Sequence, residues 1–239
     1  MCGIVGYTGA DAAQGILIEG LTRLEYRGYD SAGVAVEQDG GIQVITRKGK
    51  VAELAHTLGH FEMTGTCGIG HTRWATHGKP SEANAHPHTS CDGDIAVVHN
   101  GIIENFAELR EELAARGHAF KSDTDTEVVA HLVEEAYADM GDLQTAVAHA
   151  AGRLIGAYGL AVVCAHEPGV IIVTRKDSPI VVGRGAEGSY VASDIIAMID
   201  ATRDVVVLAD DQMAVLTADD VAYFDMEGRA IECAVTHVD

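Results

Sequence analysis

Short apolar runs separated by turn residues recur along this 239-residue chain, and their distribution limits what it can fold into. The runs after Gly141 are rich in Val, Ile and aromatic residues, which is typical of strands. They are Gly159–Cys164, Val170–Val173, Ile180–Val182, Val205–Leu208, Met213–Leu216 and Val221–Phe224. Because strands and helices gather in clusters instead of alternating, the pattern favours an α+β sandwich over a doubly wound parallel sheet.

Helical spacing is found in separate segments. Apolar residues on one face predict an amphipathic helix over Asp11–Glu25, and a similar pattern predicts a second helix around Leu109. Thr124 is followed three residues later by Glu127, which predicts a capping box that opens a third helix over Thr126–Ala138.

A hairpin signal lies between the first two helices. Ala32–Val36 and Ile42–Ile45 flank Asp39-Gly40-Gly41, a sequence typical of a tight turn. The chain contains no internal repeat and no linker rich in Pro or Ser. We therefore expect residues 1–239 to form a single domain.

Charge and cysteine content exclude several classes of function. Against 36 Asp and Glu there are 16 Lys and Arg, a net charge of −20, so neither nucleic acid nor an anionic membrane is a natural partner. The longest uncharged apolar stretch, Leu154–Ala165, is far shorter than the roughly 20 residues of a membrane span. The five cysteines form no C-x-x-C pair, which argues against a disulfide framework or a zinc ribbon. With no apolar leader visible, we expect a reducing, cytoplasmic environment.

Two motif matches have simpler interpretations. Gly183–Gly188 fits the dinucleotide pattern G-x-G-x-x-G, but a strand-like segment follows it, so it predicts a hairpin loop. Asp123–Glu134 begins like a calcium loop, yet Val128 occupies the position where the sharp turn requires Gly.

Several histidines lie close together in the sequence between His71 and His99. Only His86 and His88 form a tight pair, and no third ligand stands at a recognisable spacing. We expect local hydrogen bonds and no metal here, with a metal-dependent hydrolase kept as an alternative.

Cys2 is the strongest candidate for a catalytic residue in this sequence. The residues that follow it, Gly3-Ile4-Val5-Gly6, predict a buried strand. Removal of Met1 would leave a thiol and an α-amine on the same residue. An α-amine titrates at about 7.7–8.0, so it can act as a base near neutral pH, and a thiolate attacks carbonyl carbon readily. The alternative is that Cys2 is an ordinary small strand residue.

Three further segments carry groups that would complement such a nucleophile. Arg73, in the segment that also contains Thr76, could hold a carboxylate through two hydrogen bonds, or form a surface ion pair. Asn100 and Gly101 end an apolar run with the donors of an oxyanion hole, although a plain Asn-Gly turn would look the same. Asp125 could bind an ammonium group, or only satisfy a helix dipole.

These residues lie in motifs that resemble a known family. The segments CGIVGY, LEYRGYDSAG, HTRWATHG, NAHPH, VVHNGIIEN and SDTDTEV occur in order from Cys2 to about Val129. They resemble the glutaminase domain of the glutamine–fructose-6-phosphate aminotransferases, which are class II glutamine amidotransferases. The similarity continues more loosely to Asp194, and the purine and asparagine members of class II share fewer of these motifs.

The resemblance implies an N-terminal-nucleophile hydrolase fold, a four-layer αββα sandwich. It also implies that Cys2 attacks the glutamine amide to form a γ-glutamyl thioester and ammonia, without a cofactor or metal. Asn100 and Gly101 would form the oxyanion hole, Arg73 would bind the α-carboxylate, and Asp125 the α-ammonium group.

Supporting roles follow from the same resemblance. The glutamine loop would contain Trp74, Thr76, His77 and Gly78. Arg27 would order the surroundings of the nucleophile, and His86 would belong to a loop near a domain junction.

In the family, ammonia passes to sugar-isomerase domains that convert fructose 6-phosphate to glucosamine 6-phosphate. This chain stops at Asp239, near the expected connecting segment, so we expect a glutaminase domain alone, with the full-length enzyme a homo-oligomer. The alternatives are the glutaminase of a related class II enzyme, or a non-catalytic glutamine-binding module if Met1 is retained.

Overall fold

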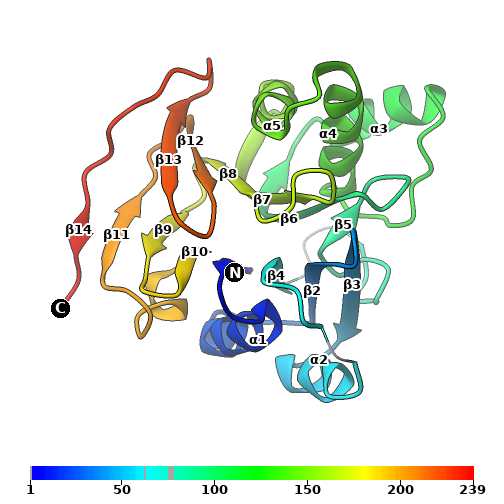
Figure 1. The fold of residues 1–239 in the computed structure, drawn as a ribbon. Helices are drawn as coiled ribbons and strands as arrows, with labels where there is room; N and C mark the ends of the chain where they lie inside the picture. The colour runs from blue at the N-terminus through cyan, green and yellow to red at the C-terminus, as the bar shows by residue number, and fades with distance from the viewer. Residues whose placement is uncertain (1, 62, 75–77) are drawn as a thin grey trace.

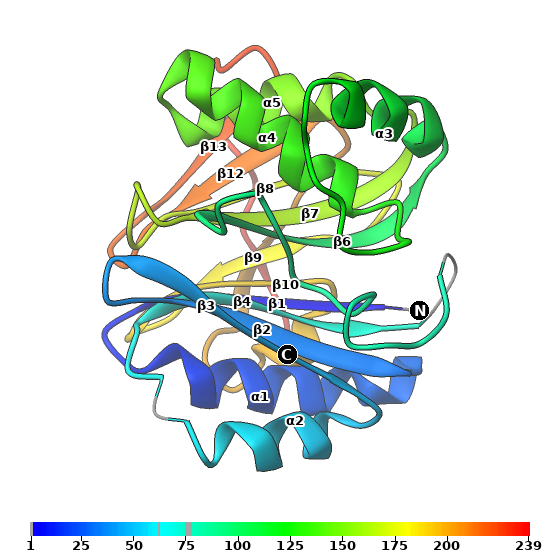
Figure 2. The same cartoon turned by 90° about the vertical axis from the view of Figure 1, so that its right-hand side faces the viewer.

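Two antiparallel sheets packed face to face form the centre of the protein, and helices cover both outer sides. The computed structural model describes residues 2–61, 63–74 and 78–239. In the layered view of Figure 2, α1 (Ala13–Leu24) and α2 (Val51–Leu58) lie below the lower sheet. The helices above the upper sheet are α3 (Phe106–Ala115), α4 (Glu127–Met140) and α5 (Leu143–Ala151). This is the predicted four-layer αββα sandwich of the α+β class, and the clustered strands and helices of the sequence are its origin.

The lower sheet has eight strands in the order β14-β11-β9-β10-β1-β4-β2-β3. Its strands are β1 (Gly3–Gly9), β2 (Ser31–Gln38), β3 (Gly41–Lys48), β4 (Cys67–Arg73), β9 (Val181–Arg184), β10 (Gly188–Ala192), β11 (Asp204–Val207) and β14 (Thr236–His237). The central position of β1 follows from its composition, because a strand covered on both faces must be apolar or glycine-rich throughout.

The upper sheet has six strands in the order β13-β12-β8-β7-β6-β5. They are β5 (His88–Thr89), β6 (Ile95–Ile103), β7 (Gly156–Cys164), β8 (Ile171–Lys176), β12 (Gln212–Leu216) and β13 (Val221–Asp225). The helices are α1 (Ala13–Leu24), α2 (Val51–Leu58), α3 (Phe106–Ala115), α4 (Glu127–Met140) and α5 (Leu143–Ala151), with short 3-10 turns at Glu25–Arg27 and Ile195–Ala197. Figure 1 shows these elements along the chain.

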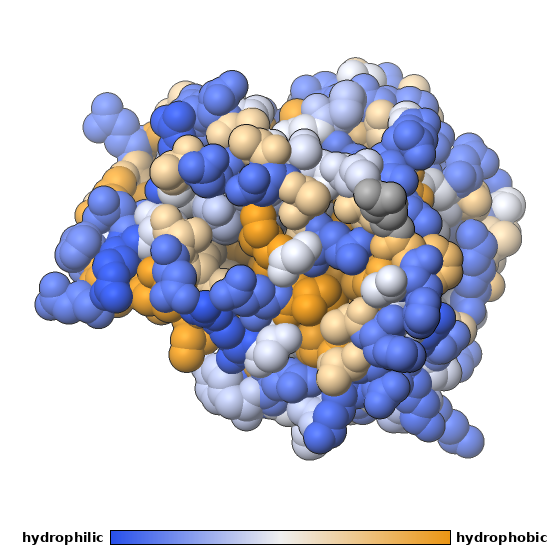
Figure 3. Space-filling view, turned by 60° about the horizontal axis from the view of Figure 1, so that its bottom comes forward, coloured by the Kyte–Doolittle hydropathy of each residue, from blue (hydrophilic) through white to orange (hydrophobic). Residues whose placement is uncertain are grey.

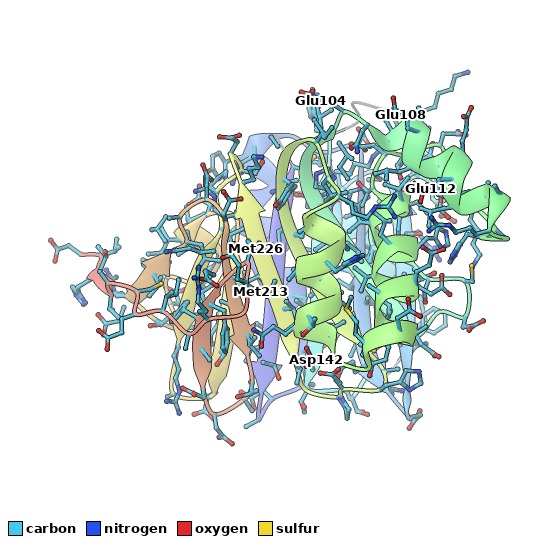
Figure 4. All side chains as sticks on the ribbon, turned by 90° about the horizontal axis from the view of Figure 1, so that it is seen from above. Glu104, Glu108, Glu112, Asp142, Met213 and Met226 are labelled. Carbon is cyan, nitrogen blue, oxygen red and sulfur yellow. The ribbon has the colours of Figure 1, made fainter. Side chains whose placement is uncertain are left out.

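Three apolar cores hold the layers together. Ile4, Ile69 and Val98 belong to the core between the two sheets and are fully buried. Leu17 and Leu21 of α1 pack on the lower sheet. The core under α3, α4 and α5 extends to Met213 and Met226, which lie close together at one side of the helices in Figure 4.

Most predicted elements are confirmed, including the hairpin between β9 and β10 in place of a dinucleotide loop. The predicted capping box at the start of α4 is wrong. The N-cap is Thr126, and its side chain makes no capping hydrogen bond. Thr124 instead bonds to His88, and the Glu127 carboxylate accepts the backbone N–H groups of Lys121 and Ser122.

The outer surface matches the acidic composition. In the space-filling view of Figure 3 hydrophilic residues cover most of the face, and hydrophobic ones gather in small groups between them. Along the α3 side, Glu104, Glu108 and Glu112 follow one another (Figure 4). Among the described residues, no helix combines the length and the apolarity needed to cross a membrane.

Candidate active site

Cys2 lies directly before the central strand β1, at the edge where the two sheets approach each other. Its sulfur accepts a hydrogen bond from the backbone N–H of Trp74 at 3.2 Å. Gly3 pairs with Thr72 of β4, and a Cβ on Gly3 would lie 2.6 Å from the Thr72 hydroxyl. The glycine therefore lets β1 and β4 approach closely enough to bring Trp74 to the thiol.

The surroundings of Cys2 disfavour the thiolate form of its side chain. Burial raises its pKa, and this effect outweighs the opposing influence of the Trp74 backbone N–H and the nearby Arg73 cation. The thiol therefore needs a base to act as a nucleophile.

The Asn100 side chain points its amide group at the Cys2 residue. Its Nδ2 donates a hydrogen bond to the Cys2 carbonyl at 3.3 Å, and its Oδ1 accepts one from His71 Nε2 at 3.0 Å. Because Oδ1 accepts from His71, the side-chain amide is oriented with Nδ2 toward Cys2. His71 was not predicted from the sequence to have this role.

Gly101 follows Asn100 on β6 with a φ of +133°. A Cβ at this position would lie 2.0 Å from the carbonyl oxygen of Ala157 on the neighbouring strand β7. Both the positive φ and the close backbone approach require glycine. Gly101 is exposed, so its backbone can face a bound ligand.

A cavity of about 490 Å³ opens beside these groups. Its lining includes Cys2, Arg27, Trp74, Asn100, Gly101, Ile102, Glu104, Ala157, Ser178 and Pro179. Its volume is within the usual range for small-molecule sites. The structure thus brings five of the residues predicted from the sequence to one cavity.

Arg73 and Asp125 lie behind this cavity and do not line it. Arg73 is 4% exposed and donates through Nη2 to the carbonyl of Gly78 at 3.2 Å. Asp125 is 5% exposed and accepts the backbone N–H of Ile103 at 2.9 Å. Thr76 and His77 are outside the described residues.

Arg27 connects the cavity wall to the nucleophile strand. Its Nη1 lies 3.2 Å from both the carbonyl and the hydroxyl oxygen of Ser193. The same Ser193 hydroxyl accepts the backbone N–H of Ile4 at 3.0 Å. Arg27 therefore contacts the residue that hydrogen-bonds to the start of β1, and its supporting role stays a prediction.

Four histidines, His71, His86, His88 and His99, form a buried group behind Asn100, which we name the buried histidine quartet. The His71 and His86 rings stack with centroids 4.2 Å apart, and His99 Nδ1 lies 2.8 Å from the Thr126 hydroxyl. Burial lowers the pKa of all four, of His71 to about 3 and of His88 to about 4. Buried neutral rings serve as fixed hydrogen-bond partners, here of Asn100, Thr124 and Thr126.

His86 lies in the segment that leads into β5, outside any helix or strand, and it is buried against His71. Its place near a domain junction stays a prediction. The sequence shows these histidines as a group between residues 71 and 99, but their spacing did not indicate that they would position Asn100.

The chain is similar to known proteins over most of its length. Residues 55–226 match the family described as "Glutamine amidotransferase domain". The chain is 50% identical over 238 residues to the glutamine–fructose-6-phosphate aminotransferase of Clostridium tetani, covering 100% of this chain and 39% of that protein. The corresponding protein of Thermus thermophilus is 51% identical over 240 residues, with the same coverage. The chain thus spans about two fifths of the length of these relatives.

Solved structures have the same fold. The glutamine phosphoribosylpyrophosphate amidotransferase from B. subtilis, complexed with ADP and GMP, superposes with a TM-score of 0.81 at 25% identity, covering 96% of this chain and 50% of that one. A second structure, titled as the allosteric regulatory enzyme of purine biosynthesis, gives a TM-score of 0.83 at 24% identity, covering 94% of this chain and 49% of that one, and supports the fold alone.

Proposed function

Because this chain belongs to the glutamine amidotransferase domain family, we propose that it hydrolyses glutamine to glutamate and ammonia with Cys2 as the nucleophile. The observation that carries the proposal is the Asn100 amide, fixed by His71 and directed at Cys2 beside the cavity. A thiol next to preorganised N–H donors is the arrangement that acyl transfer requires.

The first step is attack of the Cys2 sulfur on the side-chain amide carbon of glutamine. The α-amine of Cys2, free once Met1 is removed, takes the thiol proton. The C=O π electrons move to oxygen, and the Asn100 amide together with the Gly101 N–H holds the negative charge. The Trp74 N–H, 3.2 Å from the sulfur, stabilises the thiolate as it forms.

The tetrahedral intermediate then loses its nitrogen. The protonated α-amine returns its proton to the leaving NH₂ group, so the C–N bond breaks and ammonia departs from a γ-glutamyl thioester. Water attacks the thioester with help from the same amine, and glutamate leaves as the thiol is restored.

Arg73 and Asp125 are proposed to recognise the α-carboxylate and the α-ammonium group of glutamine. Both side chains are buried next to the cavity, and neither lines it in the described conformation. Binding by Arg73 therefore needs its hydrogen bond to Gly78 to be exchanged for bonds to the substrate. Thr76 and His77 are proposed to belong to the glutamine loop together with Trp74 and Gly78. His86 is proposed to support His71.

The wider function is proposed from the relatives, of which this chain spans 39%. As the single glutaminase domain of such a protein, it would supply ammonia to sugar-isomerase domains that aminate fructose 6-phosphate, in a homo-oligomer in the cytoplasm.

Measured glutamate release from glutamine tests the proposal. We expect Cys2→Ala to lose all measurable turnover, while the control Cys233→Ser keeps it. An intact-mass measurement should show that the active protein has lost one methionine. Equal activity of Cys2→Ala and the unchanged chain would overturn the proposal, as would full activity in protein that retains Met1.

A further inference from the structure

A second group of reactive side chains lies away from the cavity. Cys91, in the turn that precedes β6, and His118, between α3 and α4, meet His131 and Glu134 of α4. One potential ligand atom from each side chain lies within 4.8 Å of all the others. We name these four residues the Cys91 cluster.

The separations between ligand atoms fit a single small ion. Cys91 Sγ lies 3.4 Å from His118 Nδ1 and 3.6 Å from His131 Nδ1. Glu134 Oε2 lies 3.0 Å from His118 Nδ1 and 3.1 Å from His131 Nδ1. Tetrahedral zinc with bonds of 2.0–2.3 Å requires its ligand atoms to be roughly 3.3–3.8 Å apart, so small adjustments suffice.

The groups behind the ligands are arranged as in metal sites. Each histidine directs Nδ1 to the common centre. His118 Nε2 hydrogen-bonds to Glu135 at 3.2 Å, and His131 Nε2 faces the Glu127 carboxylate at 3.8 Å, an ion-pair distance without a hydrogen bond. A carboxylate behind a ligating histidine fixes the ring and its tautomer. Glu134 Oε1 accepts the backbone N–H of Cys91 at 3.0 Å, which leaves Oε2 for the ion.

From this geometry we infer that the Cys91 cluster is a structural zinc site. Zn²⁺ binds as the Cys91 S–H bond breaks and its proton passes to solvent, so thiolate and carboxylate together balance the two positive charges. Four protein ligands fill a tetrahedral shell and leave no position for substrate, which separates this site from catalytic zinc. His118 and Glu134 are only partly buried, which gives the ion an entry path.

The site would join three segments that are distant in sequence. It links the turn before β6 and the α3–α4 connection to α4. That connection also carries Asp125, so the ion would hold a proposed substrate-binding residue in place from its far side. The inference stands independently of the glutaminase proposal, because it concerns metal binding only.

Metal analysis of the chain, purified without a histidine tag, tests the inference. We expect one Zn²⁺ per chain and, for the protein stripped with a chelator, a rise in Tm of about 5–10 °C when Zn²⁺ is restored to about 100 times its Kd. Co²⁺ should give the visible spectrum of a four-coordinate ion with a thiolate charge-transfer band.

Matched variants locate the ion. Cys91→Ser should remove the charge-transfer band, and His131→Gln should abolish stoichiometric binding, while Cys233→Ser and His149→Gln should keep both. Cys2→Ala should also keep both, which excludes the proposed nucleophile as the ligand. Glu135→Gln should weaken zinc binding about 10- to 100-fold, and the exposed Glu111→Gln should not.

No bound zinc, together with a Zn²⁺ affinity of the stripped chain no greater than that of Cys91→Ser, would overturn the inference. The Cys91 cluster would then be a hydrogen-bond network. A zinc signal that disappears in Cys2→Ala would overturn it equally, by placing the ion at the cavity.

Discussion

The two ends of β6 each adjoin a group of histidines, and their surroundings are opposite. At the Asn100 end, the rings of the buried histidine quartet bond to an amide and to hydroxyl groups, and burial outweighs the more distant Asp125 and Glu127 carboxylates and lowers the pKa of all four rings. At the Cys91 end, burial also lowers the pKa of His131, but the Glu127 and Glu134 carboxylates outweigh it and raise the pKa overall.

The difference shows that the neighbours of a histidine, and not its burial alone, decide its chemistry. A buried ring whose hydrogen-bond partner is an amide or a hydroxyl stays neutral and holds that group in place, as His71 holds Asn100. With carboxylates and a thiol around it, a ring directs one nitrogen to a common centre, as His131 does. The first arrangement suits positioning, and the second suits ion binding.

The largest effect should come from the Asn100 end itself. Asn100→Ala removes one oxyanion donor, so we expect turnover to fall about 10²- to 10³-fold, or about 2.7–4 kcal/mol of transition-state stabilisation. Steady-state glutaminase kinetics measure the loss. An Asn100→Ala variant with turnover within threefold of the unchanged chain would contradict the proposed oxyanion hole.

Glycines near the two ends of β6 provide a matched pair. In Gly101→Ala, alanine would have to adopt a φ of +133°, and its Cβ would lie 2.0 Å from a backbone oxygen. We expect this substitution to lower the free energy of unfolding by about 3 kcal/mol. Gly93→Ala, with a φ of +82° and open space around it, should cost about 1 kcal/mol. Urea unfolding of both variants measures the difference, and equal costs would show that the β6–β7 approach is not tight.

The lowered pKa values of the buried histidine quartet predict that the folded protein loses stability in mild acid. The folded pKa of His88 is about 4, below its ordinary 6.5, so between these values the unfolded chain carries the extra proton. This stability is complete above pH 6.5 and decreases as pH falls toward 4. His88→Gln should reduce the slope of unfolding free energy against pH by up to about 1.4 kcal/mol per unit. Urea unfolding at several pH values measures it, with exposed His149→Gln as the control; an unchanged slope in His88→Gln would show that His88 titrates normally.

The smallest effect concerns the positioning of Asn100. Replacing His71 with Leu removes one hydrogen bond to Oδ1, so we expect turnover to fall about two- to tenfold with KM little changed. His71→Gln retains an N–H donor and should recover part of the loss. If both variants change KM and leave turnover intact, His71 affects substrate binding and does not orient the amide.

Much of this organisation could be predicted from the sequence. The apolar residues after Cys2 predicted a buried strand, and β1 is indeed the strand that brings Cys2 to the cavity beside Asn100 and Gly101. The fold class followed from the clustering of strands and helices.

Other features depend on contacts that no local pattern contains. Thr124 and Glu127 have the spacing of a capping box, but His88 and the backbone at Ser122 compete for them, and these contacts form only after the chain folds. The members of the Cys91 cluster stand at positions 91, 118, 131 and 134, a spacing that matches no familiar metal motif.

Trp74 lines the cavity with its ring against Gly28, where a Cβ would lie only 2.3 Å from ring carbon Cε3. It is also the one tryptophan in the sequence, and 54% of it is exposed. Tryptophan emission from this protein therefore has a single source, located at the proposed glutamine site. A change in emission on ligand addition would report on that cavity without any label, and its time course would follow the binding of glutamine next to Trp74.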